Sequence, residues 1–226
     1  MIAALNEEAT VGPCVEKALT AIRSLGIAGE VLVVDNGSTD RTAETAAQKG
    51  ARVEREPKKG YGNAYLAGFR AAKGRYLIMG DADDSYNFEE IGPFYDRLRE
   101  GCDLVVGNRF KGRVEKGAMP FLHRYLGTPV LTGLIRLFFG VKVGDVNCGM
   151  RGLTKEALGS MSLKSPGMEF ASEMIIKAAL VGLKIADIPC SLYRDKRVHK
   201  KHLHPWRDGL RHLALILRLA CQKYFT

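Results

Sequence analysis

The sequence predicts an α/β fold in which helices flank a mostly parallel β-sheet. In the first 110 residues, short runs of aliphatic and β-branched residues alternate with segments of helical periodicity. Strands that are separated by helices pair in parallel, because the chain must cross over the sheet before the next strand begins. With 226 residues, of which 46% are hydrophobic, the chain can bury the core that such a fold needs.

The first half of the chain reads as helices and strands in turn. A helix is expected from the Asn6-Glu7-Glu8 cap to about Leu25, since apolar residues recur along one of its faces. Asn87 begins a capping box for a helix that runs to Arg99. Further helices are expected after a cap at Ser38 or Asp40 and after the glycine-rich loop 58–62. Strands are expected at residues 30–34, 51–54, 75–80 and 103–106.

The second half is less regular. It is expected to contain a helical region at 120–139, a loop that runs into a strand at 144–152, a loop and helix at 166–181, a strand at 185–193 that Pro189 interrupts, and an amphipathic helix at 206–224.

Positive charge is concentrated at the end of the chain. Residues 194–226 hold nine Lys or Arg against Asp195 and Asp208, which leaves +7 of the total net charge of +9 in this tail. His199, His202 and His204 lie there as well. Such a tail attracts phosphate groups on lipids, nucleic acids or a phosphorylated acceptor, although it could also be only a solvated basic surface.

The five cysteines exclude two classes of protein. No C-x-x-C pair is present, so neither a zinc ribbon nor a disulfide framework is indicated, and a reduced, cytoplasmic setting is expected. No apolar stretch is long enough to span a bilayer. We therefore expect a cytoplasmic protein.

Three aspartates follow the predicted strand 75–80 directly. Asp81, Asp83 and Asp84 place carboxylates in one small volume, and hard oxygen ligands at that density suit Mg²⁺ or Mn²⁺. The alternative is an Asp-rich turn in which Asp84 or Ser85 caps the following helix. Ligands of parallel α/β sheets bind at the carboxyl ends of the strands, so the coincidence of Asp35, Asp81 and Asn108-Arg109 at such ends favours a binding site.

Two other motifs are compatible with a nucleotide site. Asp35 could accept hydrogen bonds from a base or a ribose, or it could only cap a turn. Gly60 and Gly62 would let a backbone approach a phosphate or ribose closely, or they could simply build a turn.

The order of the motifs carries a resemblance. The motifs ALNE at 4–7, VVDNGSTD at 33–40, KGYGNA at 59–64, GDADDSY at 80–86 and VVGNRF at 105–110 occur in that order, followed by DVNCGMRG at 145–152 and PWRDGLRHL at 205–213. This order resembles glycosyltransferase family 2, and within it the polyprenyl-phosphate (dolichol-phosphate) sugar synthases. The likeness covers nearly the whole chain.

The resemblance implies a GT-A (Rossmann-like) fold and a set of site residues. Glu7 and Asp35 would hold the nucleoside, Asp81 would contact the ribose or the metal, and Asp83 would coordinate Mg²⁺ or Mn²⁺. Arg109, Arg124 and Arg151 would reach donor or acceptor phosphates. The implied donor-binding residues are Leu5, Glu7, Asp35, Gly37, Gly60, Gly62, Asp81 and Ala82.

The chain departs from the family pattern in three ways. Family members begin with a hydrophobic strand before the Asn-Glu pair, and here only Met1-Ile2-Ala3 stand in its place. Ser85 stands where many relatives carry a Gln. Many relatives also continue into transmembrane helices.

The resemblance also implies how the chain is divided. Residues 1–112 would form a nucleotide-sugar-binding half, residues 113–198 the acceptor-binding half of the same domain, and residues 199–226 a basic amphipathic helix.

The expected reaction is metal-dependent transfer of a hexose from UDP- or GDP-hexose to a polyprenyl phosphate, with inversion. A lipid phosphate is already an anionic nucleophile, so it needs cations to position it and no strong base. An acceptor hydroxyl would need a base, for which Asp145, Glu169 and Glu173 are the candidates, although helix capping is the expected role of Glu169. A nucleotide- or nucleic-acid-binding protein without activity is the third possibility. No nucleic acid is expected as partner, because few aromatic residues stand among the basic ones.

The tail indicates where the reaction takes place. Leu210, Leu213, Ala214, Leu217 and Cys221 share a helical face with Arg residues around it, which is typical of a helix in a membrane interface. We therefore expect a peripheral protein at the inner face of the cell membrane. The same face could instead pack on the catalytic domain.

Overall fold

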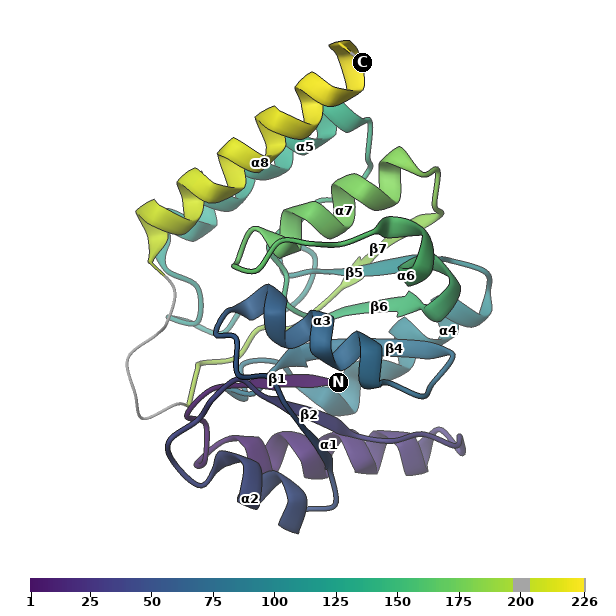
Figure 1. Ribbon diagram of the computed structural model, residues 1–226, viewed down its shortest axis with the longest axis vertical. Coiled ribbons are helices and arrows are strands. Elements are labelled where there is room, and N and C mark those ends of the chain that lie inside the picture. Colours follow the sequence, from purple (N-terminus) through teal and green to yellow (C-terminus); the bar gives the residue numbers. More distant parts are fainter. Residues whose placement is uncertain (197–203, 226) are drawn as a thin grey trace.

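The computed structural model describes residues 1–196 and 204–225. Seven strands form one sheet in the order β3-β2-β1-β4-β6-β5-β7 (Figure 1). Strand β6 runs antiparallel to β4 and β5, and the other neighbours are parallel. The strands are β1 (Ile2–Ala4), β2 (Leu32–Asp35), β3 (Arg52–Arg55), β4 (Tyr76–Asp81), β5 (Leu104–Asn108), β6 (Arg151–Thr154) and β7 (Ile185–Pro189). The predicted mostly parallel α/β fold is confirmed.

Helices cover both faces of this sheet (Figure 1). They are α1 (Val11–Ser24), α2 (Thr42–Gln48), α3 (Tyr61–Ala71), α4 (Gly92–Arg99), α5 (Thr128–Phe139), α6 (Lys155–Met161), α7 (Phe170–Leu180) and α8 (Pro205–Phe225), with a 3-10 helix η1 (Phe88–Ile91) and a π-helix η2 (His123–Gly127). The predicted C-terminal helix is therefore present.

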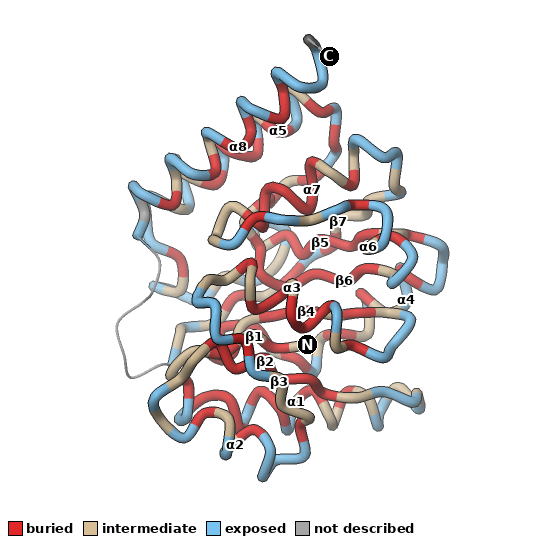
Figure 2. Tube along the Cα trace, viewed as in Figure 1, coloured by how far each residue is buried: buried red, intermediate tan, exposed pale blue. Residues whose placement is uncertain are grey.

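Alternation along the strands divides the core into two layers. Leu32 and Val34 face the layer of α3, α5, α7 and α8, whereas Val31 and Val33 face the layer of α1, α2 and α4. Successive side chains of a strand point to opposite faces, so a sheet covered on both sides needs continuous apolar runs. Figure 2 shows the result, with buried residues along the strands and exposed ones on the outer helix faces.

The first predicted helix begins later than expected. Asn6, Glu7 and Glu8 do not cap it, and α1 begins at Val11. The Asn6 side chain accepts a hydrogen bond from the Thr39 backbone N–H at 2.8 Å, and the Glu7 N–H donates to Thr42 Oγ1 at 2.7 Å. These residues are held by the loop after β2, which a sequence pattern cannot show.

Other boundaries follow local chemistry. Asn87 accepts from the Glu89 N–H as predicted, but it begins η1 before α4 continues. The region 120–139 divides into η2 and α5. Thr154 caps α6, which was not predicted, and β7 ends at Pro189 rather than at 193.

The predicted halves of the domain share one sheet, because β6 from residues 113–198 inserts between β4 and β5. The division itself stays a prediction. Its boundary at 198 and 199, together with His199 and His202, lies outside the described residues.

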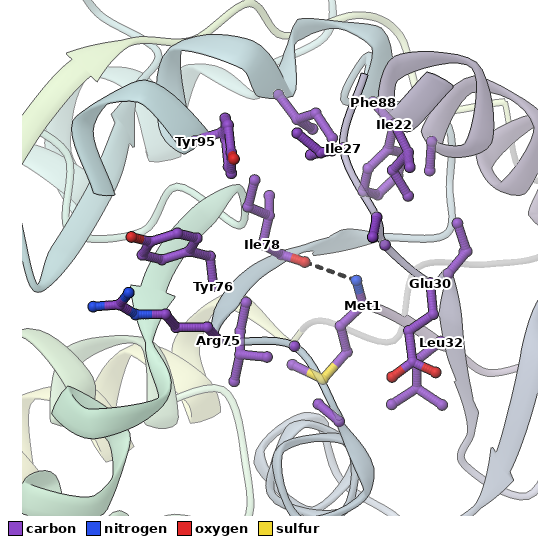
Figure 3. Close-up of a pocket in the computed structure, with 18 residues that line it drawn as sticks. Met1, Ile22, Ile27, Glu30, Leu32, Arg75, Tyr76, Ile78, Phe88 and Tyr95 are labelled. Atoms are coloured by element: carbon purple, nitrogen blue, oxygen red, sulfur yellow. Dashed lines mark hydrogen bonds between the residues drawn. The ribbon is translucent and has the colours of Figure 1, made fainter. Parts of the chain in front are cut away.

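Strand β1 forms despite its shortness and lies at the centre of the sheet between β2 and β4. Ahead of it, a pocket of about 350 Å³ separates the beginnings of its two neighbours (Figure 3). Val31, Ile78 and Phe88 contribute apolar lining, and the Met1 ammonium reaches in to donate to the Ile78 carbonyl at 2.7 Å. Burial lowers the pKa of this ammonium to about 5. The pocket therefore lies in line with β1, between its two neighbouring strands, and has an apolar lining.

Three β-branched apolar residues added before Met1 should stabilise the fold, because they would lengthen β1 and move the amino group out of the core, where burial disfavours its charged form. After the loss of chain entropy, a gain of about 2 kcal/mol is expected. Thermal unfolding should show a midpoint raised by roughly 4–8 °C. A Gly-Ser-Asp extension of equal length is the control, and an equal effect of both extensions would contradict this prediction.

A buried polar contact joins helix α8 to helix α7. His212 Nδ1 and Ser172 Oγ on α7 are 2.7 Å apart, and both residues are buried. Burial lowers the pKa of His212 to about 4, and the positive charge of Arg151 adds to this. The folded protein therefore keeps this imidazole neutral.

This buried histidine predicts acid sensitivity. The unfolded chain binds a proton as the pH falls below the ordinary histidine pKa of 6.5, while the folded protein does not until about pH 4. The contribution is thus complete above pH 6.5 and is lost as the pH falls. Between pH 7 and pH 5, chemical denaturation should show a loss of about 2 kcal/mol that His212→Gln removes. The same substitution at exposed His204 should leave the pH dependence unchanged.

Candidate functional site

The carboxyl ends of four parallel strands meet at one edge of the sheet. Ala4 at the end of β1 lies opposite Asp35 of β2, and Ala3 lies opposite Asp81 of β4. Asn108 ends β5 on the same side, because β4 and β5 both run against β6. The loops after these strands, which hold most of the predicted site residues, are therefore neighbours.

Asparagines join these loops. The Asn36 side chain accepts from the Gly60 N–H at 2.7 Å and donates to the carbonyls of Glu56 and Lys58, both at 2.9 Å. It thereby fixes the glycine-rich loop beside Asp35, whose carboxylate is buried and accepts from the Ser38 N–H at 3.1 Å. The backbone around Asp35 is set before any ligand binds.

Asp81 lies among tyrosines and glycine. The Tyr65 hydroxyl donates to the Gly80 carbonyl at 2.9 Å and lies 3.3 Å from Asp81 Oδ1. A Cβ at Gly149 would stand 2.4 Å from Asp81 Oδ2, so a side chain there would have to displace this carboxylate. Burial, together with the charge of Asp81, raises the pKa of Tyr61 and Tyr65. Both tyrosines therefore stay protonated beside this carboxylate.

The next two aspartates have different surroundings. Asp84, which adopts a positive φ of 58°, forms ion pairs with Lys17 and with Lys196, the latter at 2.7 Å. Asp83 Oδ1 accepts from the Ser85 N–H at 3.0 Å and from its hydroxyl at 2.6 Å. Asp84 is thus committed to two lysines.

The oxygen chemistry of Asp81 and Asp83 fits Mg²⁺ or Mn²⁺. No group of three or more His, Cys, Asp or Glu that could hold a metal occurs among residues 1–196 and 204–225. Mg²⁺ does not require one, because it binds through one or two carboxylates, substrate phosphates and water. Metal ligation by this pair stays a prediction.

Gly60 and Gly62 are explained by packing. A Cβ at Gly60, whose φ is 141°, would stand 2.3 Å from the Pro166 carbonyl oxygen, and one at Gly62 would stand 1.9 Å from that of Ser165. The loop before α7 occupies the space that these glycines leave open. A contact of either glycine with a donor stays a prediction.

Arg109 is held by an acid. Its guanidinium pairs with the fully buried Asp145 through Nε at 2.6 Å and Nη2 at 2.8 Å, and the side chain is 12% exposed. Asp145 also accepts from the backbone N–H groups of Arg109 and Asn147. Asp145 is therefore engaged in positioning, and contact of Arg109 with a diphosphate stays a prediction.

The other two predicted arginines lie apart from each other. Arg151 is 1% exposed and donates to the carbonyls of Cys148, Ala171 and Val146. Arg151 thereby joins the loop before β6 to α7. This buried position differs from the expectation that Arg151 would reach donor or acceptor phosphates. Arg124 is exposed on η2, with its guanidinium over the Tyr125 ring.

The remaining predicted residues line the edge. Leu5 follows β1, and Glu7 is buried with its carboxylate accepting from Thr10 Oγ1 at 3.0 Å. Position 37 favours glycine because its backbone φ is 83°. Ala82 is 2% exposed, so its side chain belongs to the core beneath the aspartates.

Several residues at the site were not predicted. Tyr61 and Tyr65 stand one helical turn apart on α3, a spacing that could have indicated a shared face. Lys17, Lys196 and Asn147 come from distant segments, and no sequence signal links them to the aspartates.

The comparison with known protein families decides the assignment. The sequence model described as glycosyl transferase family 2 matches residues 1–161. The chain belongs to this family. The predicted resemblance is confirmed.

Family 2 relatives of this chain include two proteins from Haloferax volcanii. This chain is 41% identical to the low-salt glycan biosynthesis hexosyltransferase Agl6, over 94% of this chain and 51% of that protein. It is 35% identical to a dolichyl-phosphate hexose transferase, over 80% of this chain and 76% of that protein. The chain spans about half the length of Agl6.

Solved structures of glucosyl-3-phosphoglycerate synthase from Mycobacterium tuberculosis share the fold. One has a TM-score of 0.75 at 24% identity and covers 97% of this chain and 78% of that chain. Another, in complex with Mn²⁺, uridine diphosphate and glucosyl-3-phosphoglycerate, has a TM-score of 0.72 at 25% identity and covers 98% of this chain and 78% of that chain. The expected GT-A architecture is thereby confirmed.

None of the helices in the described part of the chain has the length and apolar character needed to cross a membrane.

The packing around Gly62 predicts a stability effect without any ligand. Gly62→Ala would force a methyl group against the Ser165 carbonyl and should cost about 3 kcal/mol, measurable by chemical denaturation. Gly159→Ala in α6, where a Cβ meets nothing within 4 Å, is the control and should be neutral or stabilising. Equal stabilities of wild type and Gly62→Ala would show that packing does not explain the glycine.

Proposed function

We propose that this chain is a metal-dependent glycosyltransferase that moves a hexose from UDP- or GDP-hexose to a polyprenyl phosphate with inversion. The observation that carries the proposal is the convergence of Asp35, Asp81 and Asp83 at one sheet edge in a family 2 chain. A nucleoside and a diphosphate require such neighbours, since one carboxylate can serve the nucleoside while others serve a cation.

The names of similar proteins support the donor and the acceptor. Both Haloferax volcanii relatives are named for hexose transfer, and one of them for dolichyl phosphate. Similar solved structures hold uridine diphosphate with Mn²⁺ or Mg²⁺. These names favour a UDP-hexose donor and a lipid-phosphate acceptor for this chain.

Each residue at the edge has a proposed task. Glu7 and Asp35 hold the nucleoside, and Asp81 and Asp83 hold Mg²⁺ or Mn²⁺ or the ribose. When bound, the cation neutralises charge that develops on the leaving diphosphate. The Tyr65 hydroxyl keeps Asp81 directed toward the edge, and the ion pairs of Asp84 hold its loop in place. Preorganisation of this kind lowers the cost of reaching the transition state.

The acceptor side requires positioning rather than a base. A lipid phosphate attacks the anomeric carbon directly, and the bond from that carbon to the diphosphate oxygen breaks as the new one forms. Exposed Arg124 on η2 is the proposed cation for the incoming phosphate. Arg109 supports the loop between the strand ends through Asp145.

One observation favours a second acceptor class. Of the three candidate bases, Asp145 is paired with Arg109, and Glu173 accepts from Lys164 and Ser165 and pairs with Lys177. Glu169 keeps a buried oxygen, Oε2, without a hydrogen-bond partner among the described residues. A hydroxyl acceptor could give its proton to Glu169, which makes a soluble phosphorylated alcohol the alternative acceptor.

The decisive experiment measures binding and transfer separately. Thermal shift with UDP- and GDP-sugars and Mn²⁺ identifies the donor, and that donor is then offered to a polyprenyl phosphate and to 3-phosphoglycerate. Product with the lipid phosphate alone supports the proposal, and product with 3-phosphoglycerate alone supports the alternative. Salt-sensitive binding of single-stranded nucleic acid without any transfer would overturn both.

Asp83→Ala should lower the rate of transfer by about a hundredfold or more, since it removes electrostatic stabilisation at the reacting diphosphate. Its fold should persist, because Asp83 lies in a loop beyond β4. Asp96→Ala on the exposed side of α4 is the matched control and should keep full activity. Metal-dependent turnover of Asp83→Ala at the wild-type rate would reject the metal role of this residue.

A further inference from the structure

Helices α5 and α8 leave large apolar side chains in solvent. Helix α8 packs through Leu215, Ile216 and Leu219 against α5 and α7, and these side chains are buried. Its opposite side exposes Leu210, which is 65% exposed, and Trp206, which is 77% exposed. The helix therefore has two apolar faces, of which only one meets the domain.

The segment η2–α5 continues this exposed face. Phe121 is 77% exposed, Leu137 is 73% exposed, and Tyr125 and Leu126 are also exposed. No sequence pattern distinguished these residues from the rest of the helical region expected at 120–139. Exposed aromatic and aliphatic side chains at this density are unusual on the surface of a monomer.

The two helices run side by side (Figure 1). Their ends are joined by Lys223 Nζ and the Tyr224 hydroxyl, which donate to the Phe138 carbonyl at 2.9 and 2.8 Å. Because the helices are parallel, η2 lies beside the beginning of α8, and the pale outer sides of both are visible in Figure 2. We name Phe121, Tyr125, Leu126, Leu137, Trp206 and Leu210 the α5–α8 surface.

The charge around this surface has one sign. Residues 120–140 contain no Asp or Glu, and Asp208, the acid of α8, is buried. The exposed cations on the same helices are Arg124, Arg136, Arg207, Arg211, Arg218 and Lys223. Apolar and aromatic side chains surrounded by Arg and Lys are typical of helices that lie in the interface of an anionic membrane.

The α5–α8 surface is connected to the candidate site. Asn147, in the loop that Asp145 and Arg109 hold, donates to Thr128 Oγ1 at the beginning of α5, at 3.2 Å. Figure 1 shows β1 running from the amino terminus toward the side of the molecule on which α8 begins. The carboxyl edge of the sheet therefore opens toward the same side as η2 and Trp206.

We propose that the α5–α8 surface docks on an anionic lipid bilayer, with Phe121, Tyr125 and Trp206 inserted among the headgroups and the arginines on lipid phosphates. This inference deepens the proposed function, because a bilayer is the source of a lipid-phosphate acceptor. It uses η2 and α5 in addition to the tail helix. A second copy of the chain, the other possible occupant, would meet the same positive charge and is disfavoured by repulsion.

Vesicle flotation tests this docking without any sugar donor. The full chain is mixed with phosphatidylcholine vesicles that contain or lack phosphatidylglycerol. Wild type should float only with the anionic vesicles, and added salt should release it. The double variant Phe121→Ser, Trp206→Ser should bind at least about tenfold more weakly than wild type, because neither substituted side chain can bury apolar surface in the bilayer.

A matched control separates docking from general surface apolarity. Leu180→Ser, Val181→Ser changes two exposed apolar residues at the end of α7 and should bind as wild type does. Circular dichroism and thermal unfolding should be unchanged in both variants, since all four side chains are exposed. Failure of wild type to float, or equal loss in both double variants, would overturn the proposal.

Light scattering addresses the second copy. A dimer that Phe121→Ser, Trp206→Ser converts to a monomer, with vesicle binding retained, would also overturn it. Vesicle binding without any sugar transfer would reject the proposed reaction but support the docking surface. Transfer to a lipid phosphate in detergent, without vesicle binding, would reject the docking surface but support the reaction.

Discussion

Carboxylates buried at one edge of a parallel sheet are the constraint on which this structure depends. An ionised carboxylate in the interior is costly unless cations or N–H groups compensate it. Asp84 meets that requirement with Lys17 and Lys196, and Asp145 meets it with Arg109. Each solution ties a loop after one strand to a segment far away in the chain. The edge is thereby rigid where it would have to hold a nucleotide.

The same edge determines how the second half of the chain is attached. Arg151 on β6 joins three backbone carbonyls from the loop before it and from α7. Helix α7 in turn holds α8 through Ser172 and His212. Buried contacts therefore join the loop after Asp145 to α7 through Arg151, and α7 to α8 through Ser172 and His212.

Predictions from sequence succeeded where the signal is local. The apolar strand runs, the helical tail and the order of polar strand ends are periodic or adjacent in the chain, and the structure has all of them. They failed where a partner comes from elsewhere: Asn6, Glu7 and Glu8 suggested a helix cap, but each of them is hydrogen-bonded to the segment 39–42 instead. The same reason explains Arg151, whose type suggested a phosphate ligand and whose burial makes it a link between backbone carbonyls.

The sequence alone was sufficient for the family, the fold class and the grouping of Asp35, Asp81 and Asp83, because hydrophobic periodicity and motif order are properties of neighbouring residues. Only the tertiary structure showed that Asp84 pairs with Lys17 and Lys196. It also showed that Gly60 and Gly62 make room for the loop 165–166, and that α8 has a second, exposed apolar face beside η2. Burial and ion pairing depend on which distant segments meet in space, and a linear pattern does not contain that information.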